Sequence, residues 1–352
     1  MTPALSTTRS VLLALALACA VDADVPTPKA PAEAVQASQA PIRHGHATTD
    51  GRQAQRSLDA RIDGLQKAAN TQPAAHAALL EALRLRATLF GKVSDLDLQL
   101  RFARKGPPAD HARALLALHR FDEALELDPS VAPSVELARH EGLPELVAAR
   151  QAAAEARPSA NSWSALGDVL LASGRPADAD AAYAKALSAY RDVSPLFVAD
   201  LQFRRGYAWG ETGPEDARDP ERARALYEEA VRVLPGFVRA HVHLAELEWH
   251  AGERGAAIAR VRQVVDAEDP EPSGKLAVWL EGDEATAFRA TTTTRYDAML
   301  RRHPLAFADH GAEFFLAIGD VDRARELAEQ DLANRSTPRS RGRCEELACR
   351  GE

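Results

Sequence analysis

The chain has 352 residues, which is enough for a large buried core or for an elongated array of repeats. Its formal net charge of −8 excludes the broad basic surface that nucleic-acid-binding proteins need. Alanine and leucine are abundant, and this composition favours helices over strands.

Residues 1–20 are typical of an export signal, because a short apolar run over residues 11–18 is followed by small residues. The run is too short to cross a bilayer, which takes about 20 apolar residues. Two processing routes fit the sequence. One is cleavage after Ala18 or Ala20. The other is lipid attachment at Cys19, since the preceding residues resemble the lipoprotein box of bacterial envelope proteins. The segment therefore predicts an exported protein, either periplasmic or anchored to a membrane through a lipid on Cys19.

Residues 21–51 are rich in proline, alanine, serine and threonine and lack any periodic run of long apolar side chains. Such a segment cannot bury enough surface to offset the entropy lost on ordering, so it predicts a flexible linker. Behind a lipidated cysteine, this linker would hold a folded domain away from the membrane.

Residues 52–338 carry helical patterns, which are faint over 52–110 and clearest from 160 to 335. In SWSALGDVLLASGRPADADAAYAKAL, residues 162–187, large apolar residues recur three or four positions apart and predict one buried helical face. Gly167 lets a neighbouring helix approach closely. Gly174 predicts the end of the first helix, and Pro176 the start of the second. The stretch therefore predicts two helices joined by a tight turn.

This pattern recurs along the chain and resembles the tetratricopeptide repeat, a helix-turn-helix unit of 34 residues. Further copies are centred on Gly206 and Tyr227, on Leu244 and Ala257, and on a last pair over residues 311–332. The resemblance implies an all-α superhelix of roughly six or seven helix pairs, since one pair cannot cover its own apolar face and must stack on its neighbours.

Members of this family bind peptides or proteins in the groove lined by their first helices. The resemblance therefore implies a partner groove lined by Asn161, Ser164, Asp168, Asp200, Phe203, Tyr207, Glu211, Arg239, Val242, Glu246, Trp249, His250, Asp309 and Glu313. Aromatic side chains among carboxylates suit a protein or peptide partner with apolar and basic residues. Trp249 is the expected anchor, because large aromatic residues dominate binding energy at interfaces.

The sequence contains no nucleophile elbow, phosphate-binding loop, HExxH motif or paired CxxC. We therefore expect a non-catalytic interaction scaffold of the bacterial cell envelope, without a cofactor and without a nucleic-acid partner. The alternative is an accessory protein with a metal-handling or enzymatic role, placed in the degenerate helices of residues 52–110 or around His243 and His250. His243, Glu246 and His250 share a helical face, but two turns of helix separate the histidines by about 10 Å, too far to ligate one ion, so no metal site is predicted.

Residues 339–352 are basic and then mixed in charge, and they predict a C-terminal tail. In a continuous helix, Cys344 and Cys349 would lie on different faces with their Cα atoms too far apart for a bond. A local disulfide, an intermolecular disulfide and two unpaired thiols all remain open.

Overall fold

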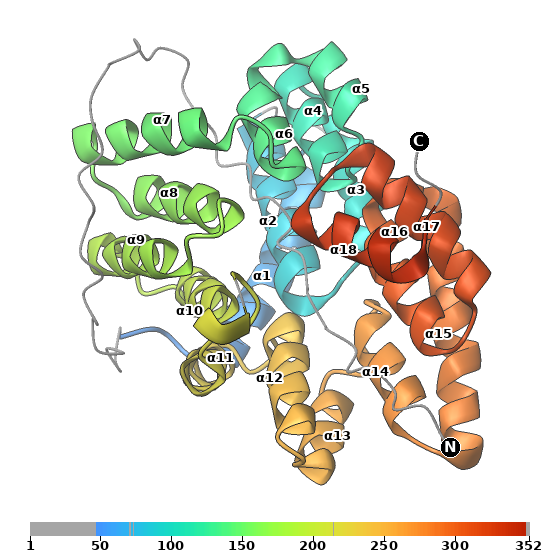
Figure 1. Cartoon of the computed structure of the whole chain (residues 1–352). Coiled ribbons are helices and arrows are strands. Elements are labelled where there is room, and N and C mark those ends of the chain that lie inside the picture. The colour runs from blue at the N-terminus through green and yellow to red at the C-terminus, as the bar shows by residue number, and fades with distance from the viewer. Residues whose placement is uncertain (1–46, 70–71, 73, 214, 350–352) are drawn as a thin grey trace.

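The computed structural model describes residues 47–69, 72, 74–213 and 215–349 (Figure 1). Within these residues all regular structure is helical, which confirms the predicted all-α class. The helices are α1 (Gly51–Ala68), α2 (Ala74–Phe90), α3 (Ser94–Ala103), α4 (Pro108–Ala117), α5 (Phe121–Leu127), α6 (Ala132–Arg139), α7 (Leu143–Ala156), α8 (Ala160–Ala172), α9 (Pro176–Ala189), α10 (Pro195–Gly210), α11 (Pro220–Val233), α12 (Val238–His250), α13 (Arg254–Arg262), α14 (Glu271–Trp279), α15 (Gly282–Arg302), α16 (Pro304–Ala317), α17 (Val321–Asn334) and α18 (Pro338–Leu347), with short 3₁₀ turns at Pro129–Val131 and Glu215–Ala217.

The helix pair predicted from residues 162–187 corresponds to α8 and α9. Ser159 caps α8 through a reciprocal pair of hydrogen bonds with Ser162. Gly174 then adopts a φ of +68°, a left-handed conformation that favours glycine, and Pro176 opens α9. The ring of Tyr183 on α9 packs directly on Gly167 of α8. The spacing of small and large residues therefore reflects how the two helices of the pair pack together. Such pairs stack from α8 to α17 into a superhelix.

The N-terminal helices do not extend the superhelix in a simple line. In Figure 1, α1 and α2 lie between the arm formed by α7–α11 and the helices α12–α18, and α2 contacts both α10 and α12. The amide of Asp269 donates to the carbonyl oxygen of Gly91 at 3.0 Å. Further along, His119 Nδ1 donates to the carbonyl oxygen of Leu305 at 3.1 Å, and Asn334 Nδ2 donates to the carbonyl oxygen of His119 at 3.1 Å. The first and last parts of the described chain are thus in direct contact.

The segment predicted as a C-terminal tail contains α18, which packs against α17. Cys344 and Cys349 form a disulfide with their Cα atoms 4.9 Å apart. The expectation that helical geometry separates them is wrong, because the helix ends at Leu347. Ala348 adopts a φ of +49° and turns the chain back towards Cys344.

The export segment, Cys19 and the linker up to residue 46 lie outside the described residues, so their predicted roles stay predictions. The described part of the linker is short, and Thr49 donates its amide to the carbonyl oxygen of Val193 at 2.9 Å. Among the described helices, none is both long and apolar enough to span a bilayer.

Candidate functional site: a cavity between the superhelix and α18

A cavity of about 980 Å³ lies on the concave side of the superhelix. Six of the residues predicted for the partner groove line it, namely Asp168, Asp200, Phe203, Tyr207, Glu211 and Arg239. They come from α8, from α10 and its end, and from the start of α12, so successive first helices do face a common space. Exposed side chains such as Arg341 and Glu345 also line the cavity, which is therefore open to solvent at its rim.

The other predicted groove residues do not line this cavity. Asn161 and His250 are exposed at helix ends, and Ser164 and Val242 are buried within the helix packing. Trp249, the expected anchor, is stacked on Trp279 with the ring centres 4.7 Å apart. The remaining three predicted carboxylates do not line the cavity, and each forms an ion pair: Glu246 with Lys275, Asp309 with Arg335 and Glu313 with Arg339.

Two walls of the cavity were not predicted from the sequence. Helices α4–α7 contribute an apolar wall that includes Leu116, Phe121 and Leu137. A further wall comes from residues 335–346 and includes Arg335, Arg339 and Arg343. The sequence predicted only a C-terminal tail here. Arg335 follows the end of α17, whereas Arg339 and Arg343 lie one turn apart on α18, so their spacing by four does not place all three on one helical face.

Arginine dominates the charge of the lining. Seven arginines line the cavity against five carboxylates: Arg204, Arg218, Arg239, Arg335, Arg339, Arg341 and Arg343, against Asp168, Asp200, Glu211, Glu345 and Glu346. The charges of the cavity therefore do not support the predicted preference for a basic partner. Two of the carboxylates that would attract such a partner, Asp168 and Asp200, already form ion pairs with Arg204.

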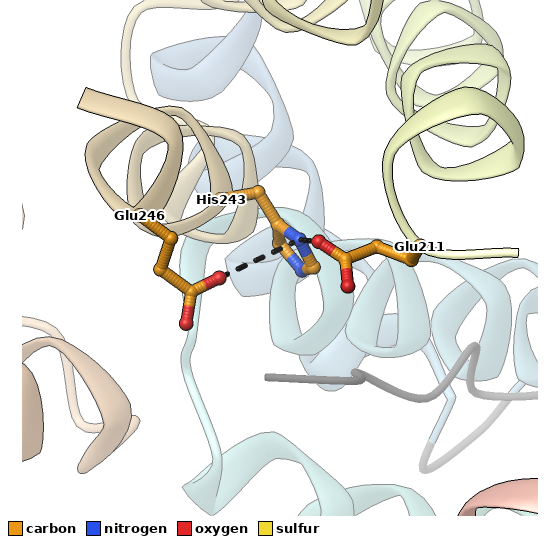
Figure 2. A group of neighbouring side chains, drawn as sticks. All are labelled: Glu211, His243 and Glu246. Atoms are coloured by element: carbon orange, nitrogen blue, oxygen red, sulfur yellow. Dashed lines mark ion pairs between the residues drawn. The ribbon is translucent and has the colours of Figure 1, made fainter. Parts of the chain in front are cut away.

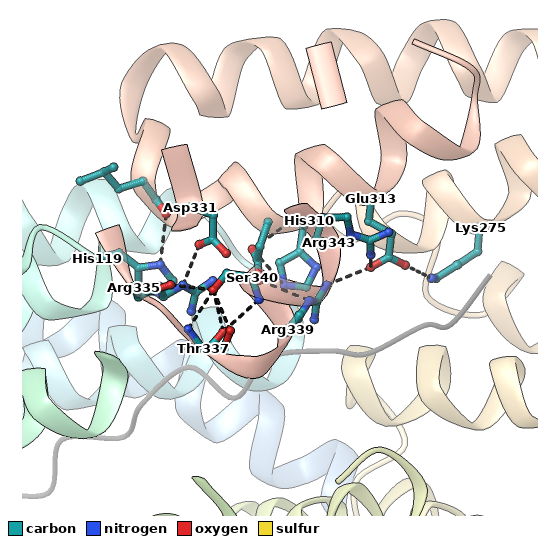
Figure 3. A network of polar contacts seen from close by, with 12 residues as sticks. His119, Lys275, His310, Glu313, Asp331, Arg335, Thr337, Arg339, Ser340 and Arg343 are labelled. Atoms are coloured by element: carbon teal, nitrogen blue, oxygen red, sulfur yellow. Dashed lines mark hydrogen bonds and ion pairs between the residues drawn. The ribbon is translucent and has the colours of Figure 1, made fainter. Parts of the chain in front are cut away.

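The arginines of the C-terminal wall are held by buried carboxylates behind them (Figure 3). Arg335 pairs with Asp331 at 2.7 Å, and Arg339 pairs with Glu313 at 2.9 Å. Burial alone would raise the pKa of Glu313, but Lys275, Arg339 and neighbouring cations outweigh it and lower that pKa to about 2. The Glu313 carboxylate therefore stays charged and fixes the arginines in place at neutral pH.

A second group of side chains, Glu211, His243 and Glu246, meets at the edge of the cavity (Figure 2). His243 Nδ1 lies 3.5 Å from Glu211 Oε1 and 3.9 Å from Glu246 Oε2. Burial lowers the pKa of His243 to about 3, so its imidazole is neutral, and burial raises the pKa of Glu211 to about 7. This trio differs from the one considered in the sequence: Glu211, from the end of α10, joins the pair on α12, while His250 is not part of it.

The geometry of the pairs gives the chain a tetratricopeptide-like fold. Glycine of the first helix packs on an aromatic ring of the second at both Gly167–Tyr183 and Gly206–Tyr227.

No family model and no curated protein matches the sequence. One similar solved structure is titled "Crystal structure of MamA", with 16% identity, 52% of this chain and 96% of that chain covered, and a TM-score of 0.29. Another is the "Crystal structure of APC/C hetero-tetramer Cut9-Hcn1", with 15% identity, 76% and 54% coverage, and a TM-score of 0.43. The match thus spans about half the length of that second chain.

Proposed function

We propose that this protein is a non-catalytic scaffold that binds an acidic, extended segment of another protein in the cavity between the superhelix and α18. The observation that carries the proposal is the cavity itself, whose volume of about 980 Å³ is at the upper end of the range for ligand sites. It is lined by concave-face residues and by seven arginines.

The chemistry of the lining favours carboxylates as the groups recognised. Arginine presents a planar array of donors that matches a carboxylate with two parallel hydrogen bonds. Although carboxylates hold several of these arginines, each guanidinium has five N–H donors, more than one carboxylate can accept. The apolar wall formed by α4–α7 adds a surface for aliphatic side chains. The best-fitting segment therefore mixes acidic and apolar residues.

We further propose that the scaffold acts in the bacterial cell envelope, tethered by a lipid on Cys19 or released by cleavage. The support is the apolar N-terminal segment and the Cys344–Cys349 disulfide, since disulfides persist in oxidising compartments. The test is partition between detergent and water of protein made in a bacterial host. A tethered protein enters the detergent phase, the Cys19→Ala variant enters the aqueous phase, and Cys349→Ala serves as a control that leaves partition unchanged.

Binding is tested by fluorescence anisotropy with a labelled peptide of alternating glutamate and leucine, and with a lysine–leucine peptide as its charge-reversed control. We expect the acidic peptide alone to bind. Arg218→Ala and Arg341→Ala should each weaken it by about tenfold, the usual effect of losing one charged hydrogen bond. The matched control is Arg301→Ala, which removes the same charge from an exposed position on α15 outside the cavity. Equal binding of both peptides, or equal loss in the control, would contradict the proposal.

A further inference from the structure

The trio of Glu211, His243 and Glu246 joins two helices that are neighbours in the superhelix. Glu211 follows directly after α10, and His243 and Glu246 lie one turn apart on α12. One ligand atom from each residue lies within 4.8 Å of the other two. All three side chains are largely removed from solvent, with exposed fractions of 8% for Glu211, 0% for His243 and 5% for Glu246.

His243 is the decisive member of this cluster. Neither of its ring nitrogens has a hydrogen-bond partner among the described residues. Its ring is enclosed by aromatic rings, with the centres of Phe203, Tyr227 and Tyr207 at 5.1, 5.4 and 5.8 Å. A buried imidazole without a partner is unfavourable, because it has lost water and gained nothing in exchange. Its Nδ1 atom is the one closest to the two carboxylates, as Figure 2 shows.

We propose that Glu211, His243 and Glu246 bind one divalent first-row transition metal ion, such as Zn²⁺, through His243 Nδ1 and one oxygen of each carboxylate. Bonds of about 2.0–2.2 Å to such an ion place neighbouring ligand atoms roughly 3–3.5 Å apart. The two separations from His243 Nδ1, 3.5 and 3.9 Å, are close to this range, and the three ligand atoms, which lie within 4.8 Å of one another, would contract around the ion. An imidazole among the ligands favours these ions over Mg²⁺ and Ca²⁺, which prefer oxygen alone.

The surrounding charges restrict how the ion is held. Lys275 Nζ pairs with Glu246 Oε1, which leaves only Oε2 to face His243. Lys275 is itself shared with Glu313 at 3.0 Å, so its charge is divided between two carboxylates. Arg239 and Arg339 are the other cations near the ring. Because Glu211 also lines the cavity, the bound ion would sit at the cavity wall, where water or a ligand can complete its coordination.

The test is equilibrium dialysis of the full chain against buffered Zn²⁺, with the bound metal counted by mass spectrometry and the site followed by the visible absorption of Co²⁺. We expect one Zn²⁺ per chain, and an affinity at least about 100-fold lower in Glu211→Gln and in His243→Gln. His241→Gln is the matched control for the histidine, since His241 is equally buried on the same helix but bonds to the carbonyl oxygen of Pro235. Glu345→Gln is the control for a carboxylate that lines the cavity outside the cluster.

Glu211→Gln keeps the test valid if His243→Gln fails to fold, because Glu211 lies after the end of α10 and not within the aromatic enclosure. The wild-type chain binding no Zn²⁺ would overturn the proposal. So would binding that persists unchanged in Glu211→Gln, which would place the ion elsewhere. The peptide assay is independent of this measurement, so failure of either proposal is seen separately.

Discussion

The aromatic ring of Tyr227 on α11 lies against Gly206 on α10, so that a Cβ atom at Gly206 would be 2.6 Å from Tyr227 Cε1. This contact lets the two helices of the pair approach closely, and Tyr227 itself is completely buried.

Gly206→Ala should therefore destabilise the fold by about 1–3 kcal/mol, the usual effect of adding a methyl group to a packed interface. The measurement is urea unfolding followed by circular dichroism. Gly64→Ala is the matched control, because no atom outside its own helix would lie within 4 Å of the new methyl group. That change should be neutral or stabilise the chain by about 0.5–1 kcal/mol, since alanine is the better helix former. Equal effects at both sites would argue against the packing role of Gly206.

Asp180 on α9 is nearly inaccessible and pairs with both Arg205 of α10 and Arg222 of α11. Asp180→Asn should destabilise the fold by about 3–5 kcal/mol, because it leaves a buried guanidinium without its counter-ion. Asp178→Asn tests an exposed pair with Arg175 on the same helix and should cost less than about 1 kcal/mol. Thermal and urea unfolding measure both. Similar losses in the two variants would show that burial does not control the strength of these pairs.

Breaking the Cys344–Cys349 disulfide should loosen α18 and with it the arginine wall of the cavity. Closing a loop this short contributes about 2 kcal/mol in the chain-entropy description. In Cys349→Ser we expect faster amide hydrogen exchange across residues 338–347 and weaker binding of the acidic peptide. Reductant should reproduce both effects in the wild type and have no further effect in the variant. Unchanged exchange in the reduced wild type would show that packing on α17 alone holds the helix.

Acid should weaken the contact between the N-terminal and C-terminal helices through His119. Burial, followed by the charge of Arg335, lowers the pKa of His119 to about 3. In the unfolded chain the pKa is about 6.5, so the unfolded state binds the proton first, and this contribution to stability is lost as the pH falls from about 6.5 towards 3.

His119→Asn should reduce the loss of unfolding free energy between pH 8 and pH 5, because asparagine does not titrate and tolerates the φ of +55° at this position. Urea unfolding at each pH measures the difference. Parallel pH profiles for the variant and the wild type would remove His119 as the source.

The helix pairs follow from short stretches of the amino-acid sequence. Residues close together in the sequence specify each pair. Two helices touch at Gly167 and Tyr183, and the chain turns between them at Gly174 and Pro176. The same spacing repeats at Gly206 and Tyr227, and this recurrence carries the resemblance to tetratricopeptide repeats that implied an all-α superhelix. It also explains why Asp168, Asp200 and Tyr207, which lie on first helices, line one space.

Which segments enclose that space, and which groups meet inside it, depends on contacts between residues far apart in the sequence. The sequence of one repeat specifies how it packs on its neighbours. The curvature of the superhelix is the sum of small rotations over many pairs, so it cannot be predicted from any single repeat. That curvature brings α4–α7 and residues 335–346 to the lining of one cavity. It also places Glu211 beside His243, 32 positions further along the chain. Glu246 and Asp309 are buried, and Glu313 is partly buried, in ionic networks where an open groove was expected.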